Sequence, residues 1–577
     1  MNKPLNNDKR TFDRNTRILL TGVFGPYARD DEYGSRWDNP MELYQNQVTR
    51  VQGAFSLRMF HRTFGLLMIE ANIDAPCTIL EFATLDRFVD ELKNNRYDVV
   101  GINAINTNIG KVKKMCEEIR TNLPEAVIVV GGHIANREDL DSEIDTDYIC
   151  QGDGIQWFRK FLGQDESAPV KHPSVTSCFG TRILGISQKR RTAATVIPSV
   201  GCPLGCNFCS TSALFGGKGK SVVFFKSGDD LFDVICQLEA DLGVDSFFIM
   251  DENFLLHKDR ALRLLELMEK HDKSWDMNVF SSARVLESYT IEQLIGLGIS
   301  WVWLGIEGRK SNYSKLEGVE TRDLVKKFQS HGIRVLGSTI IGLDNHTPEN
   351  IGDVIDYAVS HDTDFHQFML YWPLPGTPLY RELKKKDRLY PEAECPPGDS
   401  HGQRRFNFRH PHIPQGLENS LLIKAFEDDF KTNGPSLDRI IRTTLLGWQR
   451  HKNHPNPRVV NRFKSNMRGL DGDYAGVLWA MIRFFKKEPL MLPRLKELLA
   501  ALYAEFGFST RLKAPLIGMY ILNRVRREEE RLARGWTYEP TEIYEKNRRA
   551  MELEENRGGR KADRIPEVRL PVAVSRG

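Results

Sequence analysis

The chain has 577 residues, of which 41% are hydrophobic and 27% charged, a composition typical of a globular protein with several domains. Its net charge of +3 is nearly balanced and creates no overall attraction to nucleic acid. There is no uninterrupted apolar run of about 18 residues, so no membrane-spanning helix is expected. The polar start "MNKPLNNDKRTFDRN" lacks the apolar core of a signal peptide, and nine scattered cysteines are not a secreted disulfide framework. We therefore expect a cytoplasmic protein.

The first part of the chain alternates apolar strands with helical segments. The predicted strands lie within residues 16–27, 77–83, 98–105, 126–132 and 147–154. A long helical stretch is predicted around residues 44–73, between the first two strands. Five βα units with continuously apolar strands predict a parallel, doubly wound, Rossmann-like sheet covered on both faces.

Small and polar residues follow four of these strands. Ligands of doubly wound sheets bind beyond the carboxyl ends of the strands. A single glycine there is explained by a tight turn, but four such loops on one edge predict a binding site. The candidate residues are Gly22, Asn103, Gly131, Gly132 and Gly152.

A second series of six βα units follows a linker that has room for a short hairpin. Its predicted strands lie within residues 192–200, 246–254, 275–285, 301–308, 333–343 and 365–376. They predict a partial or complete parallel barrel whose chemistry lies at the carboxyl-terminal rim. The expected domains are 1–163 (Rossmann-like), 164–191 (linker), 192–395 (barrel), 396–555 (mostly helical) and 556–577 (disordered tail).

Three cysteines, Cys202, Cys206 and Cys209, follow the first strand of the second series. Structural zinc sites usually have four ligands, and a 4Fe–4S cluster usually takes four cysteines. Three thiolates leave one iron open to an outside ligand. The alternatives are a zinc site completed by Cys178 or His172, and cysteines buried without a metal.

The spacing Cys-x3-Cys-x2-Cys, with Phe208 before the last cysteine, resembles the signature of radical S-adenosylmethionine (SAM) enzymes. The resemblance implies that the three thiolates are catalytic ligands of a 4Fe–4S cluster. It also implies that SAM chelates the open iron and is cleaved by one electron to methionine and a 5′-deoxyadenosyl radical. The electron would come from an external donor such as a flavodoxin or ferredoxin.

This resemblance covers about 200 residues and implies SAM contacts at successive strand ends. Asp251 and Glu252 stand where the family often contacts the methionine amino group, and Ser282 and Arg284 suit ribose hydroxyls and a carboxylate. Glu307 follows the fourth strand. Carboxylate–ammonium and arginine–carboxylate pairs make strong charge-assisted bonds. The alternative for Glu307 and Arg284 is a structural ion pair.

The segment "DVVGINAINTNIGKVKKMCEEIRTNLPEAVIVVGGH" resembles the cobalamin-binding domain of the methylase class. The chain departs from one family pattern, because it has no Asp-x-His-x-x-Gly motif to supply a histidine to cobalt. His133 in "GGHIAN" does not fit that motif and is interpreted as a loop residue. The resemblance therefore implies cobalamin bound without a protein histidine, while other members bind none.

Together these features predict a radical SAM enzyme that methylates an unactivated carbon of a small molecule with the help of cobalamin. The alternatives are a cobalamin-independent radical SAM enzyme that couples, cyclises or rearranges its substrate, and a cluster-containing sensor. The basic amphipathic segments near the C-terminus either contact a membrane peripherally and present a lipid or isoprenoid, or close the barrel. Hopanoid methylases and tetraether-forming enzymes, which are lipid-modifying members of the class, make a lipid one candidate substrate.

Overall fold

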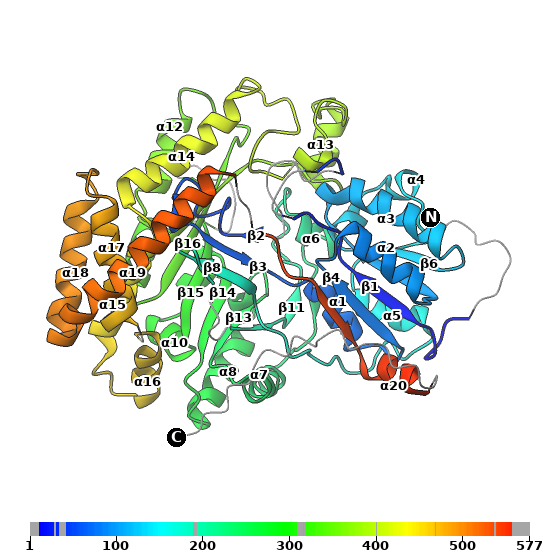
Figure 1. Cartoon of the computed structure of the whole chain (residues 1–577), viewed down its shortest axis with the longest axis horizontal. Helices are drawn as coiled ribbons and strands as arrows, with labels where there is room; N and C mark the ends of the chain where they lie inside the picture. Colours follow the sequence, from blue (N-terminus) through cyan, green and yellow to red (C-terminus); the bar gives the residue numbers. More distant parts are fainter. Residues whose placement is uncertain are drawn as a thin grey trace.

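The computed structural model describes residues 11–27, 31–33, 42–187, 193–308, 316, 318–399, 401–467, 469–535 and 538–556. Figure 1 shows three regions: the N-terminal sheet with its helices on the right, a parallel sheet in the centre, and a group of C-terminal helices on the left. The candidate site lies where the first two regions meet.

The N-terminal sheet has the strand order β18-β4-β1-β5-β6-β7. Its five parallel strands are β1 (Ile18–Thr21), β4 (Cys77–Glu81), β5 (Val99–Asn103), β6 (Val127–Gly131) and β7 (Tyr148–Cys150). All five predicted strands are confirmed. The order turns back between β1 and β5, and ligands of such sheets bind at this switch point.

Helices cover both faces of this sheet, as predicted. One apolar cluster joins the sheet to α2 (Leu85–Asn94), α3 (Ile109–Asn122) and α4 (Leu140–Glu143). The cluster on the opposite face joins it to α1 (Phe64–Glu70) and α5 (Gly154–Phe161). Ile18, Leu19 and Leu20 are fully buried because consecutive residues point to opposite, equally covered faces.

The prediction of a long helix over residues 44–73 is wrong. The segment contains turns, a 3₁₀ turn at Gly53–Phe55, β3 (Leu57–Phe60) and α1. β3 pairs antiparallel with β2 (Glu42–Leu43) and β8 (Phe179–Ile183), and β8 forms the predicted linker hairpin with β9 (Ile186–Ser187). Leu57 packs with barrel residues Leu336 and Phe365, so burial against a distant sheet outweighed the local helical pattern.

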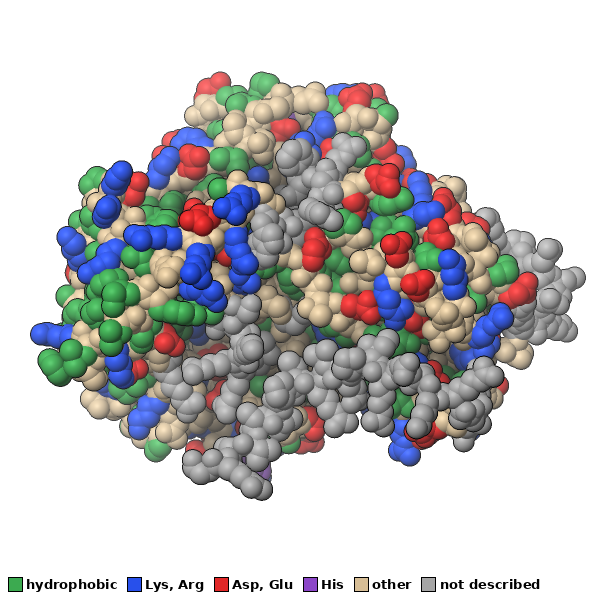
Figure 2. Space-filling view, viewed as in Figure 1, with side chains coloured by type: hydrophobic (Ala, Val, Ile, Leu, Met, Phe, Trp, Pro, Cys, Tyr) green, Lys and Arg blue, Asp and Glu red, His purple; other side chains and the backbone are tan. Residues whose placement is uncertain are grey.

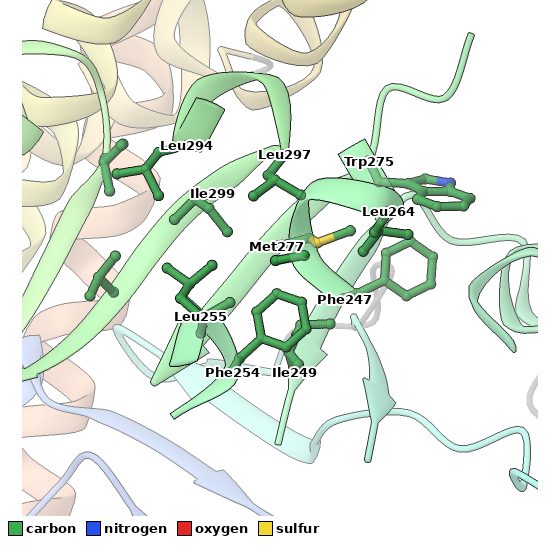
Figure 3. Packing of buried hydrophobic residues seen from close by; sticks show 14 of the residues in the cluster. Phe247, Ile249, Phe254, Leu255, Leu264, Trp275, Met277, Leu294, Leu297 and Ile299 are labelled. Atoms are coloured by element: carbon green, nitrogen blue, oxygen red, sulfur yellow. The ribbon is translucent and has the colours of Figure 1, made fainter. Parts of the chain in front are cut away.

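The central sheet has six parallel strands in chain order, β10 (Ala194–Val196), β13 (Ser246–Ile249), β14 (Asp276–Ser281), β15 (Ile299–Gly305), β16 (Arg334–Ile341) and β17 (Phe365–Leu370). The helices between and after them are α6 (Ser210–Leu214), α7 (Gly228–Leu242), α8 (Lys258–Lys270), α9 (Ala283–Glu287), α10 (Ile291–Gly296), α11 (Thr321–Ser330), α12 (Ile351–Val359) and α13 (Pro378–Lys385). The predicted six βα units are confirmed. Figure 3 shows Phe247 and Met277 of the strands beside Leu264, and Ile249 beside Phe254, where one face of the sheet meets its helices.

The C-terminal region is mostly helical, as predicted. Its helices are α14 (Leu417–Asn433), α15 (Ser436–His451), α16 (Pro457–Asn466), α17 (Ala475–Phe484), α18 (Leu492–Phe506), α19 (Phe508–Ala533) and α20 (Arg548–Asn556). One strand, β18 (Ile543–Lys546), was not predicted; it pairs antiparallel with β4 at the edge of the N-terminal sheet. Residues 557–577 of the predicted tail lie outside the described residues. Within the described part of the chain, no helix is both long and apolar enough to span a bilayer.

Candidate active site between the two sheets

The three cysteines lie on a loop between β11 (Ser199–Val200) and α6 (Ser210–Leu214). Two hydrogen bonds to backbone carbonyls fix its shape: the Cys209 N–H donates to the Cys206 carbonyl at 3.0 Å, and the Ser212 hydroxyl donates to the Cys202 carbonyl at 2.8 Å. Cys209 also caps α6, since its Sγ accepts from the Ser212 N–H at 3.4 Å. One compact loop therefore presents all three thiols beyond the end of β10.

Two glycines let this loop fold back on the segment that follows it. Gly201 has φ +84° and Gly205 has φ +68°. A Cβ at Gly205 would stand 2.5 Å from Lys218 Cβ, and one at Gly201 would stand 2.6 Å from Phe215 Cβ. The glycines beside the cysteines in the sequence are thus required by both backbone conformation and space.

The thiols of the loop are half-buried and close enough to influence one another. The pKa of Cys202 is raised to about 11, first by burial and then by the proximity of Cys209, Cys206 and Glu252. Several thiolates in one half-buried place repel one another, so they need a cationic group between them. This donor set fits an iron–sulfur cluster held by three thiolates.

The structure gives no support to the zinc alternative. The His172 Nδ1–H donates to the Pro173 carbonyl at 2.8 Å, and its Nε2 accepts from the Ile197 N–H at 3.0 Å, so both ring nitrogens are used. Cys178 lies on the edge of the hairpin, with its Sγ 3.4 Å from Thr181 Oγ1. Among the described residues, no three His, Cys, Asp or Glu side chains surround a common point as ligands of one ion would.

Asp251 braces the end of β13 and is not available to a ligand. Its buried carboxylate pairs with Arg260 Nη2 at 2.8 Å and accepts hydrogen bonds from Ser199 Oγ and from the Asn253 N–H at 3.0 Å. Ser199 belongs to the strand that leads into the cysteine loop. Of the two neighbouring carboxylates named by the sequence, Asp251 therefore has a structural role and Glu252 is left as the SAM candidate.

Glu252 lies next to the cysteine loop and has one carboxylate oxygen to offer. Its carboxylate accepts a hydrogen bond from the Gly201 backbone, while Oε2 is buried and has no hydrogen-bond partner among the described residues. Burial, and then the neighbouring Asp251, raise its pKa to about 7. A buried acceptor of this kind fits an ammonium group, which would supply both a donor and a compensating charge.

The next two strand ends carry the other SAM candidates. Ser282 precedes α9, and its Oγ lies 3.5 Å from Asn253 Nδ2, which links the ends of β14 and β13. Arg284 is exposed in the first turn of α9. Glu307, just after β15, is 3% exposed and has φ +53°, a conformation that is costly for a residue with a side chain. Backbone strain of this kind is common at binding sites, but the roles of these three residues stay predictions.

A cavity of about 390 Å³ separates the two sheets. Its first wall contains Asn103, Gly131, Gly132 and Gly152, four of the five residues predicted at strand ends of the N-terminal sheet. Its second wall, from the barrel side, contains Thr211, Leu214, Phe215, Phe224, Met250 and Glu252. The fifth predicted residue, Gly22, lines a smaller cavity that shares Asn103 with the large one. The structure therefore brings the two predicted sites together.

The first wall is rich in glycine, which fits the face of a large macrocycle such as cobalamin. Six glycines line the cavity, Gly65, Gly101, Gly131, Gly132, Gly152 and Gly154. Gly132 has φ +86°, and a Cβ there would stand 2.5 Å from the Ala104 carbonyl oxygen. A Cβ at Gly152 would meet nothing within 4 Å. The strand ends thus leave room for a broad ligand to approach the backbone.

His133 joins the two walls, a role that the sequence did not indicate. It begins a 3₁₀ helix (His133–Asn136), lines the cavity and lies with Nδ1 3.1 Å from Ser210 Oγ, next to Cys209. Asn136 Nδ2 donates to the Ser210 carbonyl at 3.2 Å. Burial lowers the pKa of His133, so its ring is neutral at neutral pH. These contacts connect segments more than 70 residues apart and leave no local sequence signal.

Comparison with known proteins finds the same two units. The model of the radical SAM superfamily matches residues 196–358, and the model of the B12 binding domain matches residues 54–162. An uncharacterized methyltransferase of Pyrococcus horikoshii is 28% identical over 192 residues, which are 32% of this chain and 40% of the relative. The bacteriochlorophyllide d C-8(2)-methyltransferase of Chlorobaculum tepidum is 22% identical over 356 residues, 57% of this chain and 76% of the relative.

Among solved structures, one that aligns with this chain is the radical SAM methyltransferase TsrM of Kitasatospora setae, with cobalamin and a [4Fe-4S] cluster bound. It aligns with 78% of this chain and 99% of its own at 15% identity, with a TM-score of 0.48. The match to the Pyrococcus relative spans less than half of that protein. Because the two matched segments form the two walls of the cavity, the chain contains a radical SAM domain that is preceded by a B12-binding domain.

Proposed function

We propose that this protein is a cobalamin-dependent radical SAM methyltransferase that acts on an unactivated carbon of a small molecule. The observation that carries the proposal is the shared cavity. Glu252 and the residues beside the cysteine loop line one wall, and the glycine-rich strand ends of the B12-binding domain line the other. Such a space between two cofactor-binding domains suits a reaction in which a reactive radical must meet its target with little water present.

The residues of the chain hold and orient the reacting groups. Cys202, Cys206 and Cys209 would hold the 4Fe–4S cluster, Glu252 would orient the SAM ammonium group, and Asn103, Gly131 and Gly132 would hold cobalamin. When bound, these groups supply one-electron reduction, a 5′-deoxyadenosyl radical and a transferable methyl group. Leu214, Phe215 and Met250 line the barrel side of the cavity with apolar surface and exclude water.

Two alternatives stay distinct from this proposal. A cobalamin-independent radical SAM enzyme would use the barrel to couple, cyclise or rearrange its substrate and would leave the glycine-lined wall without a macrocycle. A sensor would need the cluster but no SAM pocket. Glu252 Oε2, which is buried beside the cysteine loop and has no hydrogen-bond partner within the part of the chain that the structure describes, favours an enzyme over a sensor.

The proposal is tested with the full chain, reconstituted anaerobically with iron, sulfide and cobalamin and given a strong reductant and methyl-labelled SAM. We expect release of 5′-deoxyadenosine and, with an extract of small molecules and lipids from the source cells, a product that carries the label. Release of 5′-deoxyadenosine without label transfer would favour the cobalamin-independent alternative. Absence of 5′-deoxyadenosine would favour the sensor.

We also expect cobalamin to bind without a protein nitrogen on cobalt. His133 lines the cavity, but its Nδ1 lies 3.1 Å from Ser210 Oγ, and the ring serves the contact between the walls. Electron paramagnetic resonance of the Co(II) form should show no nitrogen superhyperfine splitting from the protein, in the wild type and in His133→Ala alike. Splitting that disappears in His133→Ala would contradict this prediction.

The remaining partners are an external one-electron donor of the flavodoxin or ferredoxin type and the substrate itself. A lipid or isoprenoid is one candidate substrate. The comparison of lipids from cells with and without this protein would identify it most directly.

A further inference from the structure

The first half of α19 has apolar side chains on two opposite faces. Its buried face consists of Thr510, Ala514, Gly518, Ile521 and Val525 and packs against α17. The packing is close, since a Cβ at Gly518 would stand 2.6 Å from the Trp479 ring. A helix on the surface of a soluble domain is normally polar on the side opposite its packed face. On α19 that side is apolar.

The exposed apolar side chains form one continuous stripe. Phe508, Leu512, Leu516, Met519 and Tyr520 are 73%, 56%, 67%, 54% and 55% exposed. Their spacing of four, four, three and one residues keeps them on one side of the helix over roughly 18 Å. We call these five residues the α19 stripe. Single exposed apolar residues are ordinary, but a contiguous group of five marks a contact surface.

Positive charge surrounds the α19 stripe. From Phe508 to Arg527, the helix contains five Lys or Arg residues and no Asp or Glu. Arg511 and Lys513 are exposed beside the stripe, where Lys513 also pairs with Asp471 at 2.8 Å, and Arg526 and Arg527 are exposed about two turns beyond Tyr520. Figure 2 shows hydrophobic side chains gathered on the left of the molecule, over the C-terminal helices, with Lys and Arg side chains around them. An apolar stripe with basic borders complements an anionic, amphipathic surface.

We propose that the α19 stripe docks this protein onto membranes that contain anionic lipids. The apolar side chains would enter the boundary between headgroups and acyl chains, and the Lys and Arg residues would contact the lipid phosphates. The helix would lie in the plane of the membrane, held from behind by α17. The proposal does not depend on the reaction, because docking is measurable without cofactors or turnover.

The test is flotation of the full chain with vesicles of phosphatidylcholine alone and of phosphatidylcholine mixed with phosphatidylglycerol. We expect binding to the mixed vesicles that weakens with salt, and little binding to phosphatidylcholine alone. The fraction of protein bound to the mixed vesicles should be at least tenfold lower for the double variant Leu512→Glu/Leu516→Glu than for the wild type. Because both side chains are exposed, its melting temperature should match that of the wild type.

Two controls separate the stripe from general charge. Asn419→Glu/Ser420→Glu adds the same two charges at exposed positions of α14 and should bind as the wild type does. Leu512→Asn/Leu516→Asn removes apolar surface without adding charge and should also lose binding. Wild-type protein that does not float, or Asn variants that bind normally, would overturn the proposal. So would a dimer in light scattering that dissociates in the Glu variant and does not bind vesicles, because a second copy of the chain would then cover the stripe.

Discussion

Replacing Cys202, Cys206 and Cys209 with Ala is expected to remove all iron above background and to abolish 5′-deoxyadenosine release. Anaerobic reconstitution of the wild type should give about four irons per chain, with the broad visible absorbance of a thiolate-ligated cluster. The effect should be complete, because the three thiols lie on one loop and would act as one set of ligands. Iron and acid-labile sulfide analysis measures it.

The matched controls are Cys178→Ala and Cys236→Ala, which remove half-buried thiols outside the loop. Both should keep the full iron content. If the triple variant retained its iron, or if the wild type bound one tightly held zinc instead, the assignment of the loop would be wrong. The melting temperature of the apoprotein should change little, because the hydrogen bonds accepted by the Cys202 and Cys206 carbonyls remain, and sulfur is only a weak acceptor in the backbone bonds lost at the Cys202 and Cys209 thiols.

Replacing Glu252 with Gln is expected to weaken SAM binding by about ten- to a hundredfold while the iron content stays unchanged. A hydrogen bond to a charged group contributes roughly 1.5–3 kcal/mol, and each 1.4 kcal/mol is a factor of ten in affinity. Gln keeps the shape of the side chain and removes its charge. Equilibrium binding of SAM to the reconstituted protein measures the change.

Asp251→Asn is the matched control, because it removes a carboxylate from the adjacent residue. Asp251 pairs with Arg260 in the interior, and breaking a buried pair typically costs about 3–5 kcal/mol. This variant should therefore lose stability, and Glu252→Gln should not. Glu307→Gln separates the two predictions made for that residue: weaker SAM binding at unchanged melting temperature identifies a ligand, and a lower melting temperature at unchanged affinity identifies a structural ion pair. Normal SAM affinity in a folded Glu252→Gln protein would remove Glu252 from the site.

The sequence was most informative where a local pattern has one structural solution. Continuous apolar strands that alternate with amphipathic helices predicted both parallel sheets, and three cysteines after the first barrel strand predicted the loop at the barrel mouth. It was least informative where pairing is non-local. Strand β3 pairs with β8, about 120 residues away, and β18 pairs with β4, about 460 residues away. Pairing over such separations produces no periodic pattern in the local sequence.

The candidate site shows the same division. Asp251 and Glu252 are neighbours of the same charge. Only the folded chain shows that Asp251 is in a buried ion pair with Arg260, whereas Glu252 Oε2 has no hydrogen-bond partner among the residues that the structure describes. From the sequence, His133 was interpreted as a loop residue. The folded chain places its ring against Ser210 of the other domain. Electrostatic roles depend on what each carboxylate or imidazole faces, and that is decided by contacts between distant segments.

By itself, the sequence determined the two α/β units, the cysteine loop and the glycine-rich strand ends, because hydrophobic periodicity and residue spacing are local properties of the chain. Only the tertiary structure decided that these loops face one cavity, that Asp251 is a brace, and that α19 has an apolar stripe opposite its packed face. The physical reason is that burial depends on which surfaces meet. The sequence alone does not distinguish an apolar residue that is buried in a core from one that stays exposed for a partner.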